Sequence, residues 1–196
     1  MAYTMLITGF APFGGEPINP SWEAVKALPE QIGEYRLIKL EVPVVYGLAG
    51  QTVLERAAVV QPDAILCIGQ AAGRSAVTPE YVAINLRHAN IPDNAGYCAM
   101  EKPIVEGGPD AYFSTMPVVR IREAIQKAGI PSAVSFSAGA FVCNDLLYTL
   151  LHHYAGTAMK AGFIHVPLLP QQAKNGMPSL GLDEICRALN AAIQCL

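Results

Sequence analysis

The sequence lacks any run of basic residues and carries little charge of either sign. Asp, Glu, Lys and Arg make up 15% of its 196 residues, and the formal net charge is −3. A chain without a basic patch has little electrostatic attraction for nucleic acid or for an anionic membrane, which argues against both as partners. We therefore expect a small or uncharged substrate.

The sequence also lacks a C-x-x-C pair, which argues against a zinc knuckle and against a redox dithiol. Its odd, scattered set of cysteines indicates reduced thiols; they are Cys67, Cys98, Cys143, Cys186 and Cys195. The first residues have neither the basic stretch nor the long apolar region of a signal peptide, and no window approaches the length of a transmembrane helix. These absences predict a cytoplasmic protein.

What the sequence does contain is a high apolar content, 52%, which predicts one compact domain over residues 1–196. Strand patterns alternate with helix patterns, so we expect an α/β fold: a three-layer α/β/α sandwich around a mostly parallel twisted sheet. Strands are predicted at 5–8, 36–42, 64–68, 82–86, 133–137 and 161–166, and helices at 21–28, 47–60, 116–128, 141–154 and from 182.

In a parallel sheet, ligands bind outside the carboxyl ends of the strands, and this rule selects a few residues. Gln70 follows one predicted strand, Cys143 opens the helix after another, and His165 lies at the end of a third. The helix start offers unpaired N–H groups and a positive dipole end, which stabilise a thiolate. Cys143 is therefore a candidate nucleophile, and His165 is the candidate base.

A carboxylate that orients the imidazole would complete such a site. Glu80 enters a predicted strand from a Gly-rich loop, and Asp93, Asp110 and Asp145 compete with it. Asp145 is disfavoured because a residue two positions along a helix lies on a different side from Cys143. The residues alone predict a Cys-His-acid site with the acid undecided.

Seven segments together give the chain a specific resemblance to the pyroglutamyl peptidases, a family of cysteine peptidases. They are residues 9–15 with 19–21, 69–74, 80–85, 91–94, 111–117, 138–144 and 162–167. The resemblance implies that Glu80, Cys143 and His165 are catalytic, and that an N-terminal 5-oxoproline is removed through a thioester to Cys143. It implies no metal and no other cofactor, peptide substrates with an N-terminal pyroglutamate, and a homodimer or homotetramer.

The same resemblance implies a ring pocket with apolar walls and a few polar contacts, as a neutral lactam requires. Its expected substrate-binding residues are Phe10, Phe13, Gln70, Asn90, Ile91, Phe141 and Val142. Phe10, Phe13 and Phe141 would surround the ring, and Gln70 would supply a polar contact.

Two positions depart from the family pattern. Asn90 stands where the family usually has an arginine beside the reacting carbonyl, and whether Arg87 compensates is left open. Asp145 stands where relatives often carry histidine, which we interpret as a surface change. The first departure leaves an alternative: a weakened homologue that binds 5-oxoproline-like ligands without efficient turnover. A nucleoside-phosphorylase-like enzyme has less support, because no basic phosphate cradle is evident.

Overall fold

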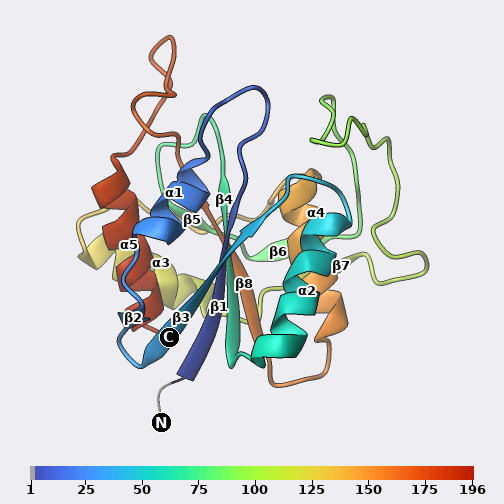
Figure 1. Cartoon of the computed structure of the whole chain (residues 1–196), viewed down its shortest axis with the longest axis horizontal. Coiled ribbons are helices and arrows are strands. Elements are labelled where there is room, and N and C mark those ends of the chain that lie inside the picture. Colours follow the sequence, from blue (N-terminus) through green and yellow to red (C-terminus); the bar gives the residue numbers. More distant parts are fainter. Residues whose placement is uncertain (1–2) are drawn as a thin grey trace.

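The computed structural model of the chain describes residues 3–196 (Figure 1). Its helices are α1 (Pro20–Ala27), α2 (Leu48–Val60), α3 (Val118–Lys127), α4 (Val142–His153) and α5 (Leu182–Gln194). Its strands are β1 (Tyr3–Phe10), β2 (Gln31–Ile32), β3 (Tyr35–Val42), β4 (Ala64–Gln70), β5 (Thr78–Pro79), β6 (Val82–Ile84), β7 (Ala111–Phe113) and β8 (Lys160–Val166). The five predicted helices correspond to α1 through α5 in order.

The main sheet has the strand order β2-β3-β1-β4-β8-β5. Strands β3, β1, β4 and β8 run parallel, while β2 and β5 pair antiparallel at the two edges. The central strands β1, β4 and β8 are buried along most of their length. Because helices cover both faces of a parallel sheet, such strands read as nearly continuous apolar runs rather than as alternating ones.

Two hydrophobic clusters, one on each face of the sheet, hold the three layers together (Figure 1). One joins α1, α3 and α5 to the sheet through residues such as Ile7 and Leu189. The other joins α2 and α4 to the opposite face through residues such as Leu6 and Leu147. Neighbouring residues of β1 thus point to opposite faces, as the pleat of a strand requires. The predicted three-layer α/β/α sandwich is confirmed.

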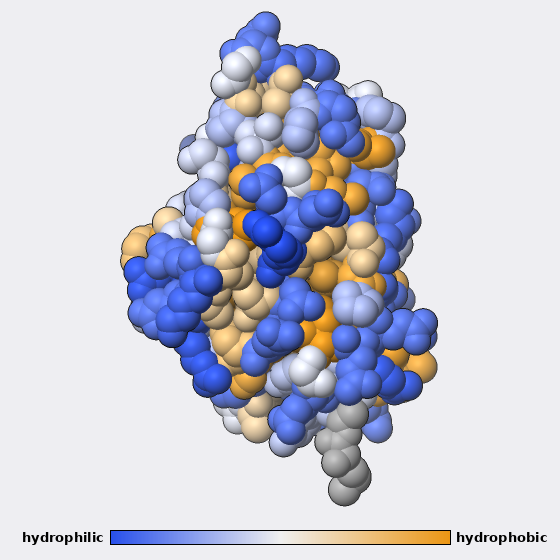
Figure 2. Space-filling model, turned by 90° about the vertical axis from the view of Figure 1, so that its left-hand side faces the viewer, coloured by the Kyte–Doolittle hydropathy of each residue, from blue (hydrophilic) through white to orange (hydrophobic). Residues whose placement is uncertain are grey.

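The outer surface of the layer that contains α1, α3 and α5 is mixed in character. Hydrophobic residues lie between hydrophilic side chains across this face (Figure 2). A shallow groove there is lined by residues of α5 together with the segments that follow α1 and α3. No helix within residues 3–196 combines the length and the apolar character that crossing a membrane requires.

The strand predicted at 133–137 is wrong. Within this segment only Ser135 forms an isolated bridge, to Glu80, and Ser132 just before it forms another, to Val77. The edge of the main sheet is instead β5, a two-residue strand antiparallel to β8. One of its two residues is Pro79, which has no N–H to donate, so regular pairing is short there.

The strand predicted at 82–86 is shorter in the structure, where it is β6, and it lies outside the main sheet. It pairs antiparallel with β7 in a separate two-stranded sheet. The segment between β6 and β7, residues 85–110, contains no helix or strand, and Asn85 holds part of it by accepting hydrogen bonds from the N–H groups of Ile104 and Val105. This long loop is thus organised around a polar side chain.

Helix α1 packs unusually close to β1, and Gly9 makes this possible. A Cβ atom at position 9 would lie 2.6 Å from Cα of Trp22 and 2.8 Å from the carbonyl carbon of Ser21. Both contacts are with backbone, so no side-chain rotation relieves them. The same contact lets the Ser21 hydroxyl accept a hydrogen bond of 2.9 Å from the Phe10 N–H.

We expect Gly9→Ala to lower the free energy of unfolding by about 1–3 kcal/mol, because a methyl group there must push α1 away from the sheet. Urea denaturation followed by circular dichroism measures this change. Gly181→Ala is the matched control, since its added Cβ meets only the flexible end of Glu184, at 3.3 Å. Equal effects of the two substitutions would contradict the close-packing argument.

Candidate active site

Cys143 is the second residue of α4, directly after the extended Phe141 and the first helical residue, Val142. The helical ladder begins with the Asp145 N–H donating to the Phe141 carbonyl. The N–H groups of Val142, Cys143 and Asn144 therefore precede the ladder and have no intrahelical acceptor. These three N–H groups form a cluster of hydrogen-bond donors next to the Cys143 side chain.

Gly69 of β4 makes room for the thiol in the sheet. A Cβ at position 69 would lie 3.1 Å from Cys143 Sγ and 2.6 Å from Cζ of Phe163. Gly69 is also the register partner of His165 on β8. The sulfur and the imidazole-bearing residue thus both lie beside the same glycine, although no hydrogen bond joins Cys143 to His165 within residues 3–196.

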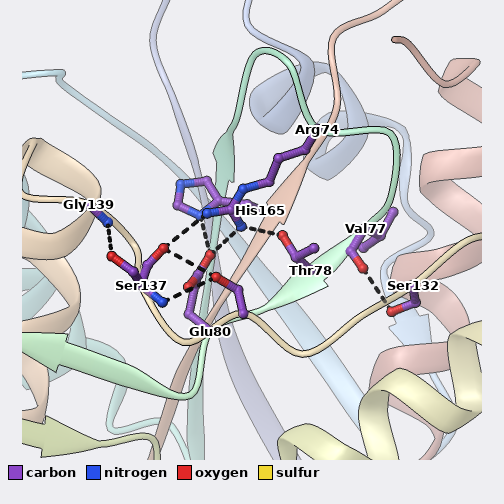
Figure 3. Close-up of polar contacts among 9 residues, drawn as sticks. Arg74, Val77, Thr78, Glu80, Ser132, Ser137, Gly139 and His165 are labelled. Atoms are coloured by element: carbon purple, nitrogen blue, oxygen red, sulfur yellow. Dashed lines mark hydrogen bonds and ion pairs between the residues drawn. The ribbon is translucent and has the colours of Figure 1, made fainter.

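His165 and Glu80 form a buried pair. Nδ1 of His165 lies 2.7 Å from Oε1 of Glu80, and the two side chains are 5% and 0% exposed (Figure 3). An ionised carboxylate only accepts hydrogen bonds, so the contact fixes Nδ1 as the protonated nitrogen. Nε2 is then left with a free lone pair, which is the state that a general base requires.

Of the four acids that the sequence offered, only Glu80 contacts a histidine. Asp93 is buried, but its oxygens accept from the N–H groups of Tyr46, Ala95 and Tyr97, so it holds a loop. Asp110 is exposed. Asp145 pairs with an arginine, as described below.

Burial governs the protonation states of the site. It raises the pKa of the Cys143 thiol to about 12, and the negative charge of Glu80 acts in the same direction. Burial also lowers the pKa of His165 below its ordinary 6.5, against the raising effect of Glu80. The pKa of Glu80 falls below 4.5 in spite of its own burial, because the hydrogen bond and charge of His165 favour the carboxylate.

The helix start favours the thiolate of Cys143, but the net effect of the surroundings on its pKa is in the opposite direction. The thiol and the imidazole are both neutral at pH 7, while Glu80 is ionised. Desolvation penalises a buried anion more than the first turn of α4 stabilises it.

A small cavity of about 40 Å³ lies beside the thiol. Four of the predicted binding residues line it together with Cys143: Phe10, Phe13, Gln70 and Phe141. The ring centroids of Phe13 and Phe141 are 6.2 Å apart. Tyr46 lies edge-on to Phe141, with 5.4 Å between the two ring centroids. Oε1 of Gln70, one of the lining residues, is buried and has no hydrogen-bond partner among the described residues.

The other three predicted binding residues are placed differently. Asn90 and Ile91 are exposed and do not line this cavity. The side chain of Val142 is fully buried in the core cluster beneath α4, so only its backbone faces the site.

Sequence reasoning missed two lining residues, Asn19 and Val44. Asn19 caps α1 by accepting from the Ser21 N–H at 3.1 Å, and it donates to the Ala11 carbonyl at 3.1 Å. Its position before a proline at a helix start signals the cap, but not the proximity to the pocket.

The interpretation of Asp145 as a surface change is wrong. Its side chain is 0% exposed and pairs with Arg87, with 2.5 Å between Oδ1 and Nε. Its other oxygen accepts from the Gly47 N–H at 2.7 Å. Arg87 also lies over the ring of Tyr46, 5.8 Å from its centroid. The guanidinium of Arg87 is thus committed to neutralising a buried carboxylate near the thiol.

The family model described as pyroglutamyl peptidase matches residues 3–196. A pyrrolidone-carboxylate peptidase of Levilactobacillus brevis is 47% identical, over 98% of this chain and 96% of its own length, and one of Vibrio vulnificus is 50% identical, over 98% and 92%.

Solved structures agree with these relatives. A crystal structure of pyroglutamyl peptidase I from Bacillus amyloliquefaciens superposes with a TM-score of 0.95 at 45% identity, covering 98% of this chain and 96% of that one. A mutant pyrrolidone carboxyl peptidase from Pyrococcus furiosus gives 0.93 at 38% identity, covering 98% and 97%. With a family model matched from residue 3 to residue 196 and relatives near 50% identity, the chain belongs to the pyroglutamyl peptidase family.

Proposed function

We propose that the chain is a cysteine exopeptidase that removes an N-terminal pyroglutamate, or 5-oxoproline, from peptides. The observation that carries the proposal is the buried His165–Glu80 pair near a helix-start cysteine, next to a small aromatic cavity. The names of the relatives, pyroglutamyl and pyrrolidone-carboxylate peptidases, specify the same reaction.

The reaction begins with the pyroglutamyl ring in the cavity lined by Phe10, Phe13 and Phe141, where apolar walls accept a neutral lactam. Oε1 of Gln70 accepts a hydrogen bond from the ring N–H, which gives this buried oxygen its missing partner. Such a pocket selects the lactam against a charged N-terminal residue, because an ammonium group would be desolvated there without a counter-charge.

In the first chemical step, Nε2 of His165 takes the proton of the Cys143 thiol as the sulfur attacks the carbonyl carbon of the pyroglutamyl residue. The carbonyl oxygen becomes an oxyanion, and the N–H groups at the start of α4 stabilise it. The imidazolium then gives its proton to the leaving amine, and the peptide departs. Glu80 stabilises the imidazolium while it exists and keeps the ring oriented throughout.

In the second step, water attacks the thioester with His165 again acting as the base. The Cys143 thiol is regenerated and free pyroglutamate is released. The step needs no metal ion, because Cys143 supplies the nucleophile and His165 the base. No finding favours the alternative of a binding protein without efficient turnover.

We further propose that the chain acts as one catalytic domain over residues 1–196, in the cytoplasm, as a homodimer or homotetramer. The five cysteines are all free thiols, which suits a reducing compartment. The oligomeric state rests on the family resemblance.

Replacing the nucleophile tests the reaction directly. We expect Cys143→Ala to reduce kcat/KM for a fluorogenic pyroglutamyl amide by more than about 10³-fold, because no other group forms the thioester. Cys186→Ala is the control, since this half-buried cysteine lies on α5 across the sheet. Absence of thiol-dependent turnover in the wild type would refute the proposed function.

The acid limb of the pH–rate profile reports on the imidazole. In the wild type, kcat/KM should fall as pH drops through the lowered pKa of His165, below 6.5, because a protonated ring cannot accept the thiol proton. Glu80→Gln removes a charge and a hydrogen bond that raise this pKa, so the midpoint should move to lower pH while kcat falls by about 100-fold or more. A midpoint that moved upward would contradict the assigned role, and Glu55→Gln on the exposed face of α2 should change neither value.

The role of Gln70 is tested by Gln70→Leu, which keeps the approximate volume and removes the buried acceptor. We expect KM for the pyroglutamyl amide to rise by about 10-fold, the cost of one unpaired lactam N–H, with a smaller change in kcat. Gln51→Leu on the surface of α2 is the matched control. An unchanged KM would assign the lactam N–H to another acceptor.

A further inference from the structure

Arg74 has contacts that the proposed reaction does not yet use. It lies in the loop after β4 and reaches three separate groups near the site (Figure 3). One terminal nitrogen donates to Glu80 Oε1 at 2.6 Å and to Thr78 Oγ1 at 2.5 Å. The other donates to the carbonyl of Ser137 at 3.0 Å.

The first contact places a permanent cation on the buried acid. Oε1 of Glu80 is shared by Arg74 and His165, while Oε2 has no hydrogen-bond partner within the described residues. Arg74 is the only lysine or arginine paired with Glu80 between residues 3 and 196. A buried carboxylate without a paired cation tends to take up a proton, and a protonated Glu80 could not stabilise an imidazolium.

The second contact ties this cation to the segment that leads into the nucleophile. Ser137 lies six residues before Cys143, in the loop that replaces the expected strand. This loop is also held to the Glu80 segment by backbone bonds, from Ser135 N–H to the Pro79 carbonyl and from Tyr81 N–H to the Ser135 carbonyl. The planar fork of a guanidinium can satisfy two such acceptors at fixed relative positions.

We propose that Arg74 is a positioning residue for the reaction: it holds Glu80 ionised against His165 and fixes the loop before Cys143 relative to that acid. This inference rests on the proposed function for its kinetic consequences. The effect of Arg74 on the alignment and charge of the Glu80–His165 pair can be measured without any substrate.

The charge of Arg74 acts on all three members of the site. It lowers the pKa of Glu80, which keeps the carboxylate ionised. It also lowers the pKa of His165, which keeps the resting imidazole neutral and able to accept a proton. On Cys143 it opposes the raising effect of Glu80. Removing the cation should therefore raise the pKa of His165, the opposite of removing Glu80.

The test compares Arg74→Met and Arg74→Lys with Arg122→Met. Arg122 is the matched control, because its side chain is 32% exposed, against 29% for Arg74. It lies on α3, on the opposite face of the sheet from the nucleophile helix α4. Arg74→Met should lower kcat by about 10- to 100-fold through misalignment, with KM little changed, and should move the acid limb to higher pH. Arg74→Lys should keep the position of the acid limb but lose part of the rate, since an ammonium lacks the fork.

A second readout follows the titration of the His165 ring by NMR, with the signal assigned through its loss in His165→Asn. The His165 pKa should be higher in Arg74→Met than in the wild type and unchanged in Arg122→Met. If Arg74→Met retains the wild-type His165 pKa and a wild-type kcat, the proposal is overturned. If Arg74→Met fails to fold, Arg74→Lys decides alone: a reduced kcat supports the proposal and a wild-type kcat refutes it. A wild type without peptidase activity would refute the proposed function, while the NMR titration would still decide the role of Arg74.

Discussion

The burial of the Glu80 carboxylate is the constraint on which the rest of the site depends. A charged group with no exposure costs several kcal/mol unless it is paired, so the fold has to bring partners to it. His165 comes from β8, 85 positions further along the chain, and Arg74 comes from the loop after β4. The parallel sheet supplies both, because the carboxyl ends of β4 and β8 lie side by side.

The nucleophile is held by a second set of buried polar contacts. Asn144 bonds to the N–H and carbonyl of Ile84 on β6 and to the carbonyl of Leu86. Asp145 bonds to Gly47 and Arg87 on the other side of the helix start. The first turn of α4 is therefore anchored in two directions, which fixes the position of the Cys143 thiol beside Gly69.

Much of this arrangement could be predicted from the sequence. The alternation of strands and helices located the end of β8, where His165 lies, and the start of α4, where Cys143 lies. The rule that sites lie past strand ends applies to His165, whereas for Cys143 it relied on a predicted strand that the structure does not contain. The segment at 133–137 was wrongly predicted as a strand because its apolar composition resembles that of one. In the structure, β5 occupies the position beside β8 at the edge of the sheet. Strand pairing depends on long-range competition, which local composition does not record.

The interpretation of Asp145 and the ionisation of the Cys143 thiol share one difficulty: both depend on burial by residues distant in the sequence. A carboxylate in a first helical turn is usually solvated, and only the approach of Arg87, 58 positions earlier in the chain, makes a buried one tolerable. The dipole argument for Cys143 was correct in sign but omitted desolvation, which only the packed structure reveals. Helix-start position alone does not determine thiol ionisation.

The neutral resting thiol has a consequence for the lifetime of the protein. Peroxides and alkylating agents react with thiolates far faster than with thiols, so the raised pKa of Cys143 slows its reaction with them relative to that of a thiolate. The sulfur becomes a strong nucleophile only when a carbonyl carbon is present and His165 removes the proton in the same event. The burial that makes Cys143 a weak acid thus also lowers its reactivity toward such reagents between turnovers.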